Sequence, residues 1–380
     1  MVKELEGSGI RIIWEKALKI KDAIRMDIGD PDFPPPTKII HELKKAIDEG
    51  YTHYAPSSGL AEAKEAIARK LKYQNGIYVE PEKEVVVTPG ASGALFAALV
   101  ATVKPGDGVL IPNPGWPLYT QMVKLAGGTP YYYRLEENND YQIDFESLEK
   151  HKDVRLIIVN SPHNPTGGVL NQQTLTQLKD IANEKDLTVI SDEAYEAIIF
   201  EGKHISIGSW SEMRDRTISI FSFSKTFSIP GLRLGYAVAP PEVAEAISKV
   251  VLYTSTCANS ITQRAIVNTI IEEHNEVKEM LDEYRLRRDI VFELLTEAGI
   301  RCVKPKGTFY LFPSYGGIIK IDSSEFALRL LEESKVSVVP GSSFGSEGEY
   351  HVRLSCTASS EKIVEGVNRI IKFINRLGGM

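Results

Sequence analysis

The chain has 380 residues, of which 43% are hydrophobic and 25% charged, and its formal net charge is −7. These values are ordinary for a globular protein with one large domain and a smaller one. Acidic and basic residues are interspersed, which argues against nucleic-acid or anionic-membrane partners, and no apolar run approaches the ~18 residues of a membrane span.

The three cysteines, Cys257, Cys302 and Cys356, are far apart and show no paired spacing. This pattern argues against a disulfide framework and a zinc site, so we expect no bound metal. Residues 1–7 lack the apolar core and cleavage signal of a secretory peptide. We therefore expect a cytoplasmic protein.

The elements of the first part of the chain alternate between short apolar runs and helical patterns. The proline-rich segment 30–36 cannot be helical, and we expect it to be an extended lead-in that crosses between two domains. We expect strands at 85–88, 109–111, 155–159, 187–190, 217–221 and 234–238, and helices at 94–103 and 172–185. This order predicts an α/β domain with a mostly parallel central sheet flanked by helices.

The last hundred residues predict a different order of helices and strands. A long charged helix is expected at 277–297, and we interpret Arg285, Arg287 and Arg288 as its solvated face. Strands at 309–312, 337–339 and 352–354 and helices at 325–334 and 362–377 then predict a smaller α+β domain.

The predicted domains follow from this change. Residues 1–41 contribute to the small domain and to the lead-in. Residues 42–285 form the large, cofactor-binding domain, and residues 286–380 form the small C-terminal domain.

Lys225 is the most informative single residue. It follows the apolar run 217–221, Ser222 and Ser224 precede it, and Arg233 follows eight residues later. Partial burial and a neighbouring cation lower the pKa of a lysine and make its amine nucleophilic. Such amines form Schiff bases, most commonly with pyridoxal phosphate.

Other polar residues follow different predicted strands. Ligands of an open parallel sheet bind beyond the carboxyl ends of its strands. Asp192 ends one strand and could keep a pyridine nitrogen protonated, although Asp192 and Tyr195 alone would also fit a helix cap and a packed tyrosine. Asn164 lies in the loop 161–168, which two prolines make rigid, and could hydrogen-bond a ring oxygen.

A phosphate could be bound at the same edge. The small residues 90–93, which include Ala91 and Ser92, form a turn into a helix, where backbone N–H groups and the helix dipole favour an anion. A plain strand-to-helix turn is an equally good interpretation, and the dinucleotide fingerprint is not matched. Ser222 and Arg233 could also reach this phosphate.

Three further residues each have two interpretations. Trp116 could lie against a flat heterocycle or pack in the core. Arg353 could bind a substrate carboxylate or form a surface ion pair. His163 is interpreted as structural, because no second histidine has metal-ligand spacing.

Together the motifs resemble those of the class I/II (aspartate aminotransferase-like) family of fold-type I aminotransferases. The resemblance covers essentially the whole chain in order. It rests on residues 29–33, 51–54, 59–60, 88–92, 161–167, 191–195, 222–225, 231–235, 304–310, 339–341, 344–345 and 352–355.

The resemblance implies pyridoxal 5′-phosphate as cofactor and a role for each matching residue. Lys225 would form the internal aldimine and move the substrate proton. Asp192 would pair with the ring nitrogen, and Asn164 and Tyr195 would hold the 3-oxygen. Trp116 would stack on the ring.

The remaining roles concern the phosphate and the substrate. The phosphate would be bound by Ala91, Ser92, Ser222 and Arg233. Arg353 would bind the α-carboxylate, with the backbone of Gly29 nearby. Tyr54 would reach the phosphate of a neighbouring subunit, which implies a homodimer with shared active sites.

The resemblance thus implies an amino acid:2-oxo acid aminotransferase. Aspartate, aromatic or alanine-type amino acids are the expected donors and 2-oxoglutarate the acceptor, in a ping-pong reaction through pyridoxamine phosphate. In some aspartate-specific relatives, a lysine at the position of Ser92 binds the second carboxylate of the substrate. This chain has a serine there, so the identity of the amino donor stays open.

Two alternatives remain. A carbon–sulfur β-lyase of the same fold is possible because residues 162–165 are similar to those enzymes. A cofactor-sensing module of transcription regulators would need a DNA-binding domain, and the forty residues before the core show no helix-turn-helix pattern.

Overall fold

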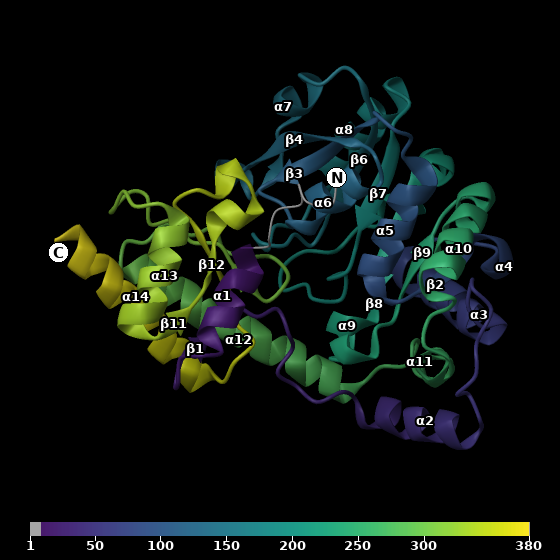
Figure 1. Ribbon diagram of the computed structural model, residues 1–380, viewed down its shortest axis with the longest axis horizontal. Coiled ribbons are helices and arrows are strands. Elements are labelled where there is room, and N and C mark those ends of the chain that lie inside the picture. Colours follow the sequence, from purple (N-terminus) through teal and green to yellow (C-terminus); the bar gives the residue numbers. More distant parts are fainter. Residues whose placement is uncertain (1–8, 380) are drawn as a thin grey trace.

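An eight-stranded sheet forms the centre of the larger body of the computed structural model, which describes residues 9–379 (Figure 1). Its strand order is β2-β9-β8-β7-β6-β3-β4-β5. The strands are β2 (Val85–Thr88), β3 (Gly108–Asn113), β4 (Thr129–Glu136), β5 (Gln142–Ile143), β6 (Val154–Asn160), β7 (Thr188–Asp192), β8 (Thr217–Ser222) and β9 (Gly235–Val238).

Five adjacent strands, from β8 to β4, run parallel, whereas β9 is antiparallel to both of its neighbours and β5 to β4. The predicted mostly parallel sheet is therefore confirmed. Alternate residues of a strand face opposite sides, so Ile158 and Ile190 pack in one core cluster while Ile157 and Val189 pack in another. Both faces are covered, as the continuous apolar runs predict.

The helices that cover the two faces differ. One core cluster joins the sheet to α5 (Gly90–Thr102), α6 (Leu118–Leu125) and α10 (Pro241–Ser255). The opposite face packs against α7 (Phe145–Glu149) and α8 (Gln172–Glu184). At the β2 edge, that face is covered by α2 (Thr37–Asp48), α3 (Ala61–Lys70) and α11 (Ser260–Ile266).

The smaller body lies at the left of Figure 1 and contains a three-stranded sheet, β10-β13-β12. Its elements are β10 (Tyr310–Leu311), α13 (Ser323–Ser334), β11 (Val336–Ser337), β12 (Val339–Pro340), β13 (Val352–Ser355) and α14 (Ser360–Gly378). The N-terminal elements α1 (Gly9–Ala17) and β1 (Ile24–Arg25) join it, because β1 pairs with β11. The predicted α+β composition is confirmed.

One strand prediction is wrong in detail. We expected a single strand at 337–339, but the chain changes partner at Val338: β11 pairs with β1, whereas β12 pairs with β13. A continuous apolar run gives no sign of such a change, because both pieces are buried.

The long helix α12 (Asn275–Glu297) connects the two bodies, and the predicted solvated face is partly wrong. Arg285 is exposed, but Arg287 and Arg288 are buried. Arg287 pairs with Asp32 of the lead-in, and Arg288 pairs with Glu201 of the large body. The two arginines are therefore buried by segments that are distant in sequence.

The domain boundaries stay a prediction, and the boundary at 285/286 falls inside α12. The lead-in has neither helix nor strand between residues 26 and 36, as expected of its prolines. Across residues 9–379, no helix combines the length and the apolar character required to cross a membrane.

Candidate active site

A cavity of about 280 Å³ lies where β6, β7 and β8 end. It is lined by every predicted site residue except Tyr54: Gly29, Ala91, Ser92, Trp116, Asn164, Asp192, Tyr195, Ser222, Lys225, Arg233 and Arg353. The fold thus brings together side chains that are spread over more than 300 residues of sequence. Parallel strands explain this convergence, since their carboxyl ends share one edge of the sheet.

Lys225 projects into the cavity from α9 (Phe223–Thr226), the short helix that follows β8. Ser222 fixes the start of this helix, because its hydroxyl accepts a hydrogen bond from the Ser224 N–H at 3.2 Å. The Nζ of Lys225 donates to the carbonyl of Gly29.

Burial lowers the pKa of Lys225 from 10.5 to about 8. The charge of Asp30 opposes this change, whereas the positive charges of Arg353 and Arg233 add to it. A lysine with this pKa has a substantial neutral fraction in mildly alkaline solution, which is the form that can act as a nucleophile or base.

Asp192 is buried at the end of β7. Its Oδ2 accepts a hydrogen bond from the Tyr119 hydroxyl at 2.6 Å, and its Oδ1 accepts one from the Ala194 N–H at 3.1 Å. Burial raises the pKa of Asp192, while these two donors oppose the rise. Neither donor carries a charge, so the carboxylate can accept a cationic partner from the cavity.

Arg353 lies on β13 and reaches the cavity from the small body. Its two terminal nitrogens donate to Asn164 Oδ1 at 3.0 Å and to the Asp27 carbonyl at 2.8 Å. Its Nε is buried without a partner. The guanidinium also lies 4.2 Å from the ring centroid of Tyr310, whose hydroxyl is 3.0 Å from that of Tyr195.

The N-terminus of α5 supplies an anion site. No side chain caps this helix, so its first N–H groups, near Ala91 and Ser92, face the cavity without a side-chain acceptor. The guanidinium of Arg233 lies beside Gly90, where an added Cβ would be 2.6 Å from a guanidinium nitrogen. Gly90 is required here, since it also has a φ of +77°.

These features fit pyridoxal phosphate. The uncapped helix end and Arg233 match a phosphate, the Asp192 carboxylate matches a protonated ring nitrogen, and Lys225 matches an aldehyde carbon. The unpartnered Nε of Arg353 is a donor available to a substrate carboxylate.

Trp116 and Tyr54 differ in how they relate to this cavity. Trp116 lines it and packs edge-to-face against Tyr119, with ring centroids 5.4 Å apart. Tyr54 is 86% exposed and lies outside the cavity. Its role in a neighbouring subunit stays a prediction.

Residues that we did not predict also line the cavity: Tyr119, Asn160, Ala194, Ser224, Pro230 and Tyr310. Asn160 donates to the Asp192 carbonyl at 2.9 Å and accepts from the Asn164 N–H at 2.9 Å, so it ties two site loops together. Its place at the end of a strand could have identified it. Tyr119 carries no such signal, because it lies in a helix.

His163 agrees with its structural interpretation. It is buried, its Nδ1 lies 2.8 Å from Thr166 Oγ1, and burial lowers its pKa to about 3. It therefore stays neutral and stiffens the loop that carries Asn164. Among residues 9–379, no cluster of three His, Cys, Asp or Glu side chains could hold a metal ion.

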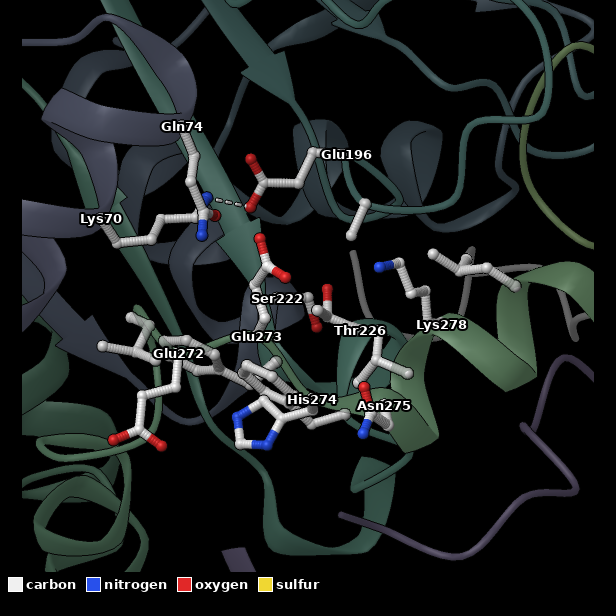
Figure 2. A pocket seen from close by; sticks show the side chains of 16 residues that line it. Lys70, Gln74, Glu196, Ser222, Thr226, Glu272, Glu273, His274, Asn275 and Lys278 are labelled. Atoms are coloured by element: carbon white, nitrogen blue, oxygen red, sulfur yellow. Dashed lines mark hydrogen bonds and ion pairs between the residues drawn. The ribbon is translucent and has the colours of Figure 1, made fainter. Parts of the chain in front are cut away.

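A second cavity, of about 250 Å³, lies near α9 and the start of α12 (Figure 2). Phe223 and Thr226 of α9 line it, and Lys70 and Glu196 form an ion pair in its wall. Of the predicted site residues it contains only Ser222. We therefore place the active site in the cavity that holds Lys225.

Comparisons with known proteins agree with this geometry. The sequence profile of the family described as aminotransferase class I and II matches residues 21–370. The aspartate aminotransferase of Pyrococcus abyssi is 42% identical over 372 residues, covering 97% of this chain and 95% of that protein. The aromatic-amino-acid aminotransferase 2 of Thermococcus litoralis is 39% identical, with the same coverage.

A solved structure is similarly close. The aromatic aminotransferase of Pyrococcus horikoshii OT3 superposes with a TM-score of 0.90 at 40% identity, covering 96% of this chain and 99% of that one. The chain therefore belongs to the class I and II aminotransferase family. It is an aminotransferase that depends on pyridoxal phosphate, and both predictions are confirmed.

Proposed function

We propose that this aminotransferase moves the amino group of an aspartate, aromatic or alanine-type donor to 2-oxoglutarate in a ping-pong reaction. One observation carries the proposal: the amine of Lys225, the carboxylate of Asp192 and the guanidinium of Arg353 line a single cavity. A base, an acidic partner for a ring nitrogen and a carboxylate-binding group are thus available to one small molecule.

When bound, pyridoxal phosphate supplies an electron sink for the bonds at the substrate α-carbon. Asp192 would hold the ring nitrogen in its protonated form. Asn164 and Tyr195 would orient the ring through its 3-oxygen, and Trp116 would cover one face. The phosphate would be held by the N–H groups near Ala91 and Ser92 together with Ser222 and Arg233.

Lys225 would do the proton transfer. Because burial brings its pKa to about 8, its amine has a neutral fraction that can serve as a base toward the proton on the α-carbon. Its position on a short helix, capped by Ser222, restricts the direction from which the amine approaches.

Arg353 would bind the α-carboxylate of the substrate. Its donors already converge on the cavity, where Asn164 and the Asp27 carbonyl orient them. A planar guanidinium can bind a carboxylate through two parallel hydrogen bonds, which also fixes the α-carbon relative to Lys225.

The site defines the side chain of the amino-donor substrate less narrowly. The cations that line the cavity are Lys225, Arg233 and Arg353, all of which have other proposed tasks. Ser92 lines the cavity at the position where, by the family resemblance, some aspartate-specific relatives have a lysine that binds a second carboxylate. Relatives named for aspartate and for aromatic amino acids are almost equally similar, which supports a broad donor range.

The proposal includes a homodimer. Tyr54 has a large exposed aromatic ring in a loop before α3, and it would contact the phosphate bound by the neighbouring subunit. A cytoplasmic location also stays a prediction.

The test is a product assay with a panel of single donors and 2-oxoglutarate. The proposal predicts glutamate and the matching 2-oxo acid in equal amounts. Release of pyruvate and ammonia from cystathionine without any acceptor would instead favour the carbon–sulfur β-lyase.

A further inference from the structure

The lead-in between β1 and α2 passes directly over the active site. Its carbonyl groups make successive contacts with side chains: Asp27 accepts from Arg353 at 2.8 Å, Ile28 from Thr357 at 3.0 Å, and Gly29 from Lys225. Residues 27 to 36 have no helix or strand of their own. The position of this segment therefore depends on contacts with side chains from other parts of the chain.

Two of those contacts use side chains that also have proposed tasks in the reaction. Lys225 would leave the Gly29 carbonyl when it reacts, and Arg353 would bind the substrate carboxylate as well as the Asp27 carbonyl. A lasting anchor must use groups that the reaction does not need.

Asp32 and Arg287 provide such an anchor. A terminal nitrogen of Arg287 lies 3.0 and 2.9 Å from the two carboxylate oxygens of Asp32. The Tyr284 hydroxyl donates to the same carboxylate at 3.1 Å and accepts from the Asp32 N–H at 3.3 Å. Phe33 packs edge-to-face on Tyr284, with ring centroids 5.3 Å apart.

The same arginine also contacts the small body. It donates to the Cys356 carbonyl at 3.1 Å and to Glu283 at 2.8 Å, and Glu283 accepts from Ser360 at 2.8 Å. Cys356 directly follows β13, the strand that carries Arg353. Arg287 thus connects the lead-in, α12 and the end of β13.

The pair is well shielded. The Arg287 side chain is 7% exposed and that of Asp32 27%. A shielded ion pair with several hydrogen bonds is costly to break, because removing one partner leaves a charge without compensation.

We propose that the Asp32–Arg287 pair is a clasp that positions the lead-in over the active site. It keeps the carbonyls of Asp27 and Gly29 aligned with the two cations that handle substrate. This inference rests on the proposed roles of Lys225 and Arg353. It makes Asp32 and Arg287 positioning residues, since neither lines the cavity.

The test compares three variants of the cofactor-loaded enzyme. Asp32→Asn keeps the shape and a hydrogen bond to Tyr284 but removes the charge. Arg287→Met removes the guanidinium and keeps an apolar stem. Glu283→Gln is the matched control, because it alters another partner of Arg287 without touching the lead-in.

We expect Asp32→Asn and Arg287→Met to raise KM for donor and acceptor about 10-fold while kcat stays within about threefold. Hydrogen exchange of the segment 26–36 should accelerate, while β8 stays protected. Glu283→Gln should change neither quantity.

The exchange measurement does not depend on knowing the donor, so it separates failure of the clasp from failure of the proposed function. Unchanged KM and unchanged exchange in Asp32→Asn would overturn the proposal. So would faster exchange over the whole small body with an equal loss of kcat, because that result would show general loosening.

Discussion

The hydroxyl of Tyr119 lies 2.6 Å from Oδ2 of Asp192, and both side chains are buried. Burial raises the pKa of Tyr119 far above its usual value, so this hydroxyl keeps its proton and acts as a donor. It thereby favours the ionised form of Asp192, whose own burial acts in the opposite direction. The pair sets the charge at the point where a cofactor ring nitrogen would bind.

Tyr119→Phe should weaken catalysis at low pH. Losing the donor raises the pKa of Asp192 further. When the pH is lowered, the Asp192 carboxylate of the variant therefore takes up its proton at a higher pH than that of the wild type. We expect kcat/KM to drop about 3- to 10-fold, with its acidic limb shifted to higher pH.

Tyr133→Phe is the control, because this buried tyrosine bonds to the Ile158 carbonyl and not to Asp192. An unchanged pH profile in Tyr119→Phe would show that the hydrogen bond does not govern Asp192.

Lys225→Met should stabilise the cofactor-free protein at neutral pH. The folded pKa of Lys225, about 8, is below the ordinary 10.5, so the unfolded chain binds more protons between these values. The wild type should therefore gain stability relative to the variant as the pH rises from 8 to 10.5. We expect a relative gain on the order of 2 kcal/mol after allowance for water in the cavity.

Urea unfolding of both proteins at several pH values measures this difference. A constant difference between pH 7 and pH 10.5 would show that burial does not lower the pKa of Lys225.

Arg353→Lys should reduce kcat/KM for amino acids about 100-fold, since a lysine cannot form the two parallel hydrogen bonds of a guanidinium. The loss should be much smaller for an amine that lacks the α-carboxylate. Steady-state kinetics with an amino acid and its decarboxylated amine give both values. An equal loss for the two substrates would assign Arg353 a structural role.

Tyr54→Phe and Lys225→Ala should complement each other if the active sites are shared. Each variant alone should be impaired, Lys225→Ala completely. Refolding an equal mixture should restore about a quarter of the wild-type activity, because half the dimers are mixed and each has one intact site. No recovery, with mixed dimers shown to form, would place Tyr54 outside the neighbouring site.

Much of the fold and the site could be predicted, for identifiable physical reasons. The strands around Asp192 and Lys225 are continuous apolar runs, and residues that follow such strands must meet at one sheet edge. Site residues that lie on helices could not be predicted in this way. Tyr119 precedes Asp192 by 73 residues, and only the packing of α6 on the sheet brings them together.

Arg287 shows where local patterns mislead. A charged helix normally turns its arginines to water, and Arg285 does so. The lead-in that buries Arg287 lies 255 residues away in sequence. No periodicity within α12 contains that information.

The most direct test of the central claim is the absorption spectrum of the purified protein during titration with single amino acids, without any 2-oxo acid. We predict that the band of the lysine-bound cofactor converts stoichiometrically to that of pyridoxamine phosphate, fastest with the true donor class. A band that persists while pyruvate and ammonia accumulate would contradict the proposed aminotransferase reaction and favour lyase chemistry.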